Sequence, residues 1–124
     1  MAKSPLPAGA RGPLCFVDAR GGAFAALAAA IARAQGHGDA LAAATNAVSV
    51  PAEIGVVLDE IGLKAPDVLA AGKLPGDAQR VDLASWELSL HEGEHGEGSL
   101  ERLSAARIAR DRVERRVEAL LAAG

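Results

Sequence analysis

Two hydrophobic patterns alternate along the chain. Short apolar runs bounded by turn residues are typical of buried parallel strands, and they occupy four segments: 13–18, 40–45, 67–70 and 80–86. Apolar residues that recur at helical spacing predict three helices, which begin near Phe24, Pro51 and Ser99. Strands that alternate with helices predict an α/β domain whose parallel sheet is covered on both faces.

The length and composition fit one domain. A chain of 124 residues buries about two thirds of its unfolded surface. Hydrophobic residues make up 50% of the sequence, but alanine dominates them. The core must therefore rely on small side chains and close approach of the backbone. We expect residues 13–124 to form a single domain, and residues 1–12, rich in Pro, Gly and Ala, to form an extended lead-in.

Charge and cysteine content narrow the possible partners. A net charge of −3 gives no basis for nucleic-acid binding. No membrane partner is expected either, because Asp18 and Arg20 interrupt the apolar run of residues 13–31. Cys15 is the only cysteine, so no intramolecular disulfide exists, and a reducing, cytoplasmic location is expected.

The stretch "FVDARGGAFAALAAAIAR" (16–33) combines a strand, a glycine-bearing turn and an alanine-rich helix. It resembles the N-terminal signature of the low-molecular-weight protein tyrosine phosphatases and the related thioredoxin-coupled arsenate reductases. In that family a strand ends in Cys, and five loop residues, Arg, Ser and a helix follow. The resemblance continues through residues 43–63, residues 74–88 and the closing helix.

The resemblance implies a fold and an activity. The fold would be a three-layer α/β sandwich with a four-stranded parallel sheet in the order 2-1-3-4. The activity would be that of a protein tyrosine phosphatase or an arsenate reductase. The stretch between Leu63 and Leu74 is shorter than is usual in the family, so we expect the largest departure there. An apolar helical edge left uncovered by the shortened stretch would favour a homodimer.

The catalytic residues of the family are replaced in this sequence. The resemblance places Asp18 at the nucleophilic thiolate, Phe24 at the arginine that clamps the oxyanion, and Leu90 at the general-acid aspartate. The loop residues between the first two positions are Ala19, Arg20, Gly21, Gly22 and Ala23. Cys15 lies within the strand and cannot replace a cysteine of low pKa at a helix N-terminus. These losses imply a catalytically inactive member without the Cys-x5-Arg signature, which acts as a binding or regulatory module with a protein partner or as a homodimer.

Two roles are open for Asp18. Carboxylates attack phosphoryl groups in enzymes that use Mg²⁺, and Asp82 or Glu87 could join Asp18 from the end of a neighbouring strand. Alternatively, Asp18 caps the helix that begins near Gly22 and occupies the amides that a phosphate would use. We favour the cap, because no further carboxylate is adjacent to Asp18 in the sequence.

The segment His91-Glu92-Gly93-Glu94-His95 satisfies two zinc-protease patterns, H-E-x-x-H and H-x-x-E-H. Both patterns need a helix that places the two histidines on one face, and the surrounding glycines make a helix unfavourable. We expect a solvated loop and no metal or other cofactor. The alternative is a weak transition-metal site through His91, His95 and Glu87. The competing function is thus an active metal-dependent phosphatase or hydrolase that uses Asp18 or this loop.

The closing helix carries six arginines among four acidic residues. Pairs at helical spacing, such as Asp111 with Arg115, predict an ion-paired, solvated face. Leu103, Ala106, Val113, Val117 and Leu120 are expected on its inner face.

Overall fold

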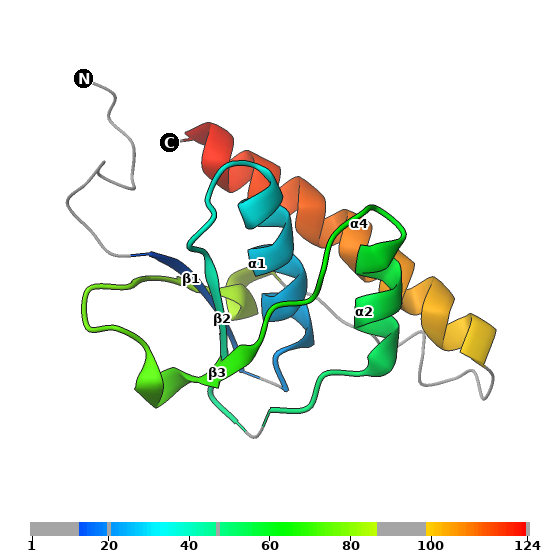
Figure 1. Cartoon of the computed structure of the whole chain (residues 1–124), viewed down its shortest axis with the longest axis horizontal. Helices are drawn as coiled ribbons and strands as arrows, with labels where there is room; N and C mark the ends of the chain where they lie inside the picture. The colour runs from blue at the N-terminus through cyan, green and yellow to red at the C-terminus, as the bar shows by residue number, and fades with distance from the viewer. Residues whose placement is uncertain (1–12, 20, 47, 87–98, 124) are drawn as a thin grey trace.

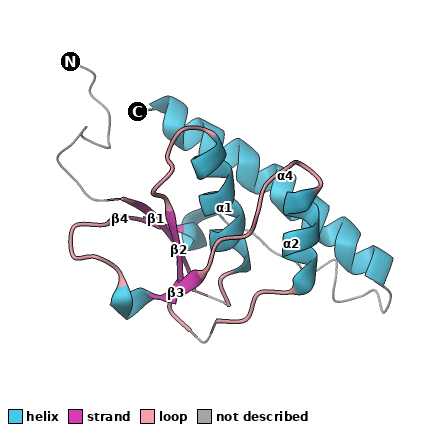
Figure 2. Ribbon diagram, in the orientation of Figure 1, coloured by secondary structure: helices cyan, strands magenta, loops and turns pink. Residues whose placement is uncertain are grey.

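The helices and strands follow one another along the chain much as the hydrophobic pattern predicts. The computed structural model describes residues 13–19, 21–46, 48–86 and 99–123. The strands are β1 (Leu14–Asp18), β2 (Leu41–Ala44), β3 (Val68–Ala70) and β4 (Gln79–Asp82). The helices are α1 (Ala23–Ala34), α2 (Ala52–Asp59) and α4 (Ser99–Ala123), and the 3₁₀ turns are η1 (Ala71–Lys73) and η2 (Leu83–Trp86). The strands form one four-stranded sheet, parallel throughout, which confirms the α/β prediction (Figures 1 and 2).

The order of the strands corrects the expected 2-1-3-4. The sheet reads β3-β2-β1-β4, so the strand near residues 67–70 lies outside β2, and β4 takes the place beside β1. A third strand beside β1 would have required α2 to cross on the face opposite α1. The buried side chains of α2 instead join the core that contains α1 and α4, and these side chains are Ile54, Val57 and Leu58. The chain therefore advances in one direction from β1 through β2 to β3, with both crossover helices on one face.

The sheet is covered on both faces, but by different kinds of structure. Leu14 and Phe16 of β1 lie in the large core formed with the helices. Cys15 and Val17 point the other way, into a smaller cluster with Leu74 of the β3–β4 connection. Figure 1 shows that connection on the side of the sheet away from α1, α2 and α4. Among the described residues, the second cover is therefore a connecting segment that contains the 3₁₀ turn η1 and no helical layer.

The first helix, α1, is enclosed almost completely. Ten of its 12 residues, Ala23 through Ala32, are buried. A helix that is apolar all round must be surrounded by other elements, and α1 contacts β1 and β2 on one side and α2 and α4 on the other. Its alanines allow the close approach that the composition requires.

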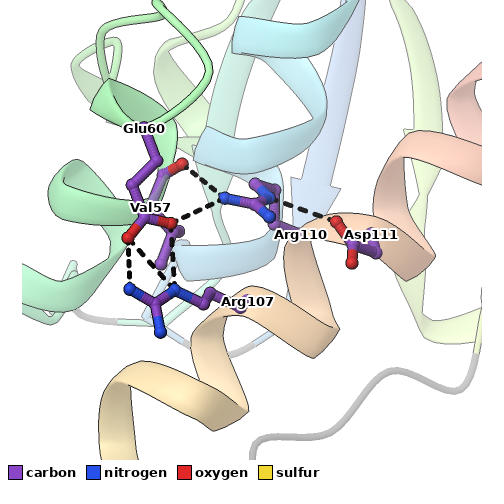
Figure 3. Close-up of polar contacts among 5 residues, drawn as sticks. All are labelled: Val57, Glu60, Arg107, Arg110 and Asp111. Atoms are coloured by element: carbon purple, nitrogen blue, oxygen red, sulfur yellow. Dashed lines mark hydrogen bonds and ion pairs between the residues drawn. The ribbon is translucent and has the colours of Figure 1, made fainter. Parts of the chain in front are cut away.

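The long helix α4 is held to the end of α2 by a group of charged side chains (Figure 3). Arg107 Nε lies 3.0 Å from Glu60 Oε1, and Arg110 Nη1 lies 2.9 Å from the same oxygen. Arg110 Nη1 also donates to the Val57 carbonyl at 2.9 Å. The hydrogen bond from Arg107, supported by that from Arg110, lowers the pKa of Glu60 from its ordinary value of 4.5. The stabilisation from Glu60 is therefore present above that value and is lost as the pH falls through the lowered pKa.

The inner face of α4 is the one expected. Ala106, Val113 and Val117 are buried, whereas the ion pairing differs from the prediction. Within the described chain, Asp111 pairs with Arg110, at 3.2 Å, and not with Arg115. Among the described residues no helix has the length and apolar character needed to cross a bilayer.

Arg110→Ala should destabilise the protein more than Arg107→Ala. Arg110 is only 14% exposed, and its loss removes a charged donor from both Glu60 and the Val57 carbonyl, at a cost of about 1–3 kcal/mol. Arg107 is 45% exposed, and solvent screens such exposed pairs. Urea denaturation of the two variants measures the difference. A larger loss for Arg107→Ala would contradict this assignment.

Candidate functional site

Asp18 links the two ends of the loop between β1 and α1. The Asp18 side chain is buried, with 4% of the residue exposed, and its Oδ2 accepts a hydrogen bond from the Phe24 backbone amide at 3.1 Å. Phe24 is the second residue of α1, so its amide has no acceptor within the helix. The N-cap position itself is Gly22, and Asp18 reaches the helix end from four residues earlier. The prediction that Asp18 caps this helix is confirmed.

A second set of contacts to the same loop comes from the segment after β2. We call residues 45–46 and 48–50 the covering segment. The Thr45 amide donates to the Asp18 carbonyl at 3.1 Å, and the Ser49 amide donates to the Gly21 carbonyl at 2.8 Å. Asn46 Nδ2 donates to the Ala19 carbonyl. The carbonyls of Asp18, Ala19 and Gly21 therefore point towards the covering segment. The position of this part of the loop is fixed by contacts that do not involve the Asp18 carboxylate.

Two adjacent glycines allow this close packing. A Cβ on Gly21 would lie 2.4 Å from the Ser49 carbonyl oxygen. Gly22 has a φ of +102°, and a Cβ there would lie 2.6 Å from Val68 Cγ1. No side chain fits at either position without movement of a neighbour. The sequence does not predict that Ser49 and Val68 pack against these glycines. A pair of adjacent glycines is the sign that it offers of a close approach to the backbone.

Asp82 does not join Asp18 in a metal site. Asp82 is the register partner of Val17, and Val81 is the partner of Phe16. Register partners share a face of the sheet, so Asp82 lies on the face of Val17, opposite that of Asp18. No group of three or more possible metal ligands occurs within the part of the chain that the structure describes.

Several predicted site residues lie outside the described residues. They are Arg20 of the loop and the positions Glu87, Leu90, His91 and His95. The predictions made for them stay predictions. The lead-in, residues 1–12, is outside the described chain as well.

Phe24 and Cys15 both belong to the interior. The Phe24 side chain is buried in the large core, although the resemblance places a clamping arginine at this position. Cys15 has no exposed surface, and burial raises the pKa of its thiol to about 11 against a smaller opposing effect of Arg80. A thiol with that pKa is protonated at neutral pH and is no nucleophile.

The fold has a counterpart among solved structures. An arsenate reductase in its phosphate-binding state superposes with a TM-score of 0.67 over 89% of this chain and 96% of that chain, at 16% sequence identity. This chain has an arsenate reductase-like fold. No family model and no curated protein matches the sequence. The arsenate reductase-like fold agrees with the resemblance drawn from the sequence and, at this identity, concerns the fold alone.

Gly21→Ala should destabilise the protein by about 1–3 kcal/mol, because the new methyl group meets the Ser49 backbone. Gly55→Ala is the matched control. A Cβ there meets nothing within 4 Å, and alanine in a helix interior is better than glycine by about 0.5–1 kcal/mol. Thermal and urea unfolding of both variants measure the contrast. A neutral Gly21→Ala would show that the covering segment is not packed against the loop.

Cys15 should be inert in the folded protein. We expect no reaction with dithionitrobenzoate at pH 8 in buffer and complete reaction in denaturant. The raised pKa means that the folded state favours the protonated Cys15 thiol. The contribution of this thiol to the stability of the protein is therefore complete below its ordinary pKa of 9.0 and is lost as the pH rises towards about 11. Cys15→Ala should remove this part of the alkaline loss. Fast labelling of the native thiol would contradict the burial.

Proposed function

We propose that this chain is a catalytically inactive relative of the arsenate reductases and low-molecular-weight phosphatases, and that it acts as a binding or regulatory module. The observation that supports the proposal is the hydrogen bond from the Phe24 amide to the buried Asp18 carboxylate. It places a negative side chain at the helix N-terminus, where an oxyanion substrate would bind.

Two electrostatic effects oppose oxyanion chemistry in this loop. An ionised Asp18 repels an anion by about 4 kcal/mol per unit charge at 4 Å, for an effective dielectric constant near 20. The resemblance implies a clamping arginine at Phe24, and the loss of a charged hydrogen bond costs about 1.5–3 kcal/mol. The helix dipole offsets only about 0.3–1 kcal/mol. Repulsion and the missing arginine therefore outweigh the attraction.

The metal-dependent alternative has little support from the described residues. Its nucleophile would be Asp18, whose carboxylate already accepts a hydrogen bond from the helix. Its nearest candidate ligand on a neighbouring strand, Asp82, lies on the opposite face of the sheet.

A module without chemistry acts through its surface. We propose a protein partner, or a second copy of the chain, as the binding partner. The large hydrophobic side chains exposed to solvent are candidates for such a contact, and in the described chain they are Val48, Val56, Ile61 and Ile108.

The native protein should not turn over para-nitrophenyl phosphate, with or without Mg²⁺, Mn²⁺ or Zn²⁺. Phosphate, vanadate and arsenate should bind with a Kd above about 1 mM, equivalent to less than about 4 kcal/mol. Steady-state assays and the melting temperature in each anion provide the measurements.

The variant Asp18→Cys/Phe24→Arg is the comparison, because it restores both groups that the resemblance requires. Anion binding by this variant alone would support the proposal. Metal-dependent turnover by the native chain that disappears in Asp18→Asn would overturn it in favour of an active phosphatase.

A further inference from the structure

We propose that β4 is a dimerisation edge, at which the β4 strand of a second copy of this chain pairs antiparallel about a two-fold axis through Val81. The inference rests on the proposed function, in which the chain acts through a protein partner or a second copy. It goes further in naming the second copy as the partner and β4 as the surface that binds it.

The first observation concerns the position of β4 in the sheet. The order of the strands is β3-β2-β1-β4, so β4 pairs with β1 on one side and forms one end of the described sheet (Figure 2). Every residue of β1 is buried, whereas half-buried and exposed residues alternate along β4. An outer strand of this kind presents backbone donors and acceptors along its outer edge.

The backbone groups of β4 point in two directions. The Gln79 amide donates to the Pro13 carbonyl at 2.9 Å, so Gln79 presents its backbone to the chain that enters β1. Successive residues of a strand present their backbone groups to opposite edges. The backbone of Val81 therefore also faces β1, and the backbones of Arg80 and Asp82 face the outer edge. A partner strand would form its hydrogen bonds with Arg80 and Asp82.

The charges on β4 select one register for that partner strand. Arg80 and Asp82 are exposed and lie on one face of the sheet, because their register partners Cys15 and Val17 do. A two-fold axis through Val81 places Arg80 of each copy opposite Asp82 of the other, in the hydrogen-bonded positions of an antiparallel pair. Opposite charges in such positions stabilise the pair. An axis through Arg80 or through Asp82 would instead place like charges opposite each other, which is destabilising.

The other face of β4 favours the same register. Val81 is half-buried and packs against the large core, and in the proposed pair it lies opposite Val81 of the second copy. A cross-strand pair of β-branched side chains is stabilising. The outer strand at the other end of the sheet, β3, has the sequence Val-Leu-Ala and carries no charge that could select a register. The charge pattern therefore assigns the contact to β4.

The proposed dimer is a weak one. Each copy contributes a strand of four residues, and such a contact buries less than the roughly 1,000 Å² expected of a stable interface. The two-fold axis uses the same residues of both copies, so the assembly closes at two. We therefore expect a reversible dimer that forms as the protein concentration rises.

The experiment is sedimentation velocity of the full chain between about 10 μM and about 1 mM, the range suited to a weak interface. The dimer fraction should rise with concentration. Arg80→Asp and Asp82→Arg should each weaken the dimer by about tenfold or more, because each places like charges opposite each other in both cross-strand pairs. The double variant Arg80→Asp/Asp82→Arg should restore the dimer. An equimolar mixture of the two single variants should form heterodimers, in which both pairs have opposite charges again.

Two further variants complete the test. Arg116→Asp changes the net charge as Arg80→Asp does, at an exposed position of α4, and should leave the dimer unchanged. Val81→Cys should form a disulfide between copies on oxidation, because opposed Cα atoms at that type of position lie about 4.5 Å apart, within the range of a disulfide. Cys15 has no exposed surface and should not compete. This cross-link does not depend on the folding of the charge variants.

Three results would each overturn the inference: a monomer throughout the concentration range, a dimer that both single charge variants leave unchanged, or no disulfide in oxidised Val81→Cys. They would leave the inactivity of the native chain untouched, with a different protein as its partner. Turnover of para-nitrophenyl phosphate by the native chain would overturn the proposed function while leaving the dimer in place.

Discussion

The hydrogen bond from the Phe24 amide to the Asp18 carboxylate joins the last residue of β1 to the first turn of α1. These two elements occupy the middle of the fold, since β1 lies between β2 and β4 and α1 contacts both α2 and α4. The angle at which the chain leaves the strand and enters the helix therefore positions the other helices. A carboxylate suits this junction, because it accepts a hydrogen bond from a helix amide that has no other acceptor and also interacts favourably with the helix dipole.

The fold class could be predicted from the sequence, but the neighbours of each strand could not. Apolar runs and helical spacing depend on local burial, which is why α1, α2 and α4 match the expected segments. The position of β3 depends on which face α2 covers, and the stripe of Ile54, Val57 and Leu58 has the same spacing on either face. The expected strand order failed for this reason. The 3₁₀ turn at Leu83–Trp86 lies within the segment 80–86 that was expected to be one strand, because no turn residue separates it from β4.

The part of the candidate site that could be predicted is the part formed by side chains. Asp18 stands between a strand and a helix, and its capping role follows from that position and its chemistry. Asn46 also contributes a side chain, but nothing in the sequence pattern predicts that it donates a hydrogen bond to the distant Ala19 carbonyl. The contact of Ser49 with Gly21 is made by backbone atoms, which are alike for every residue. Only the absence of a side chain at Gly21 and Gly22 hinted at it.

The burial of α1 has a consequence during synthesis of the protein. Residues 23–32 are apolar, have no polar face and are buried in the finished fold, yet a large part of their cover is α4, residues 99–123. During synthesis on the ribosome, the chain emerges with α1 complete long before α4 exists. Until α4 is released, the apolar, alanine-rich residues 23–32 lie open to water and to other nascent chains. The protein thus depends on a helix that is made well after α1 to cover α1.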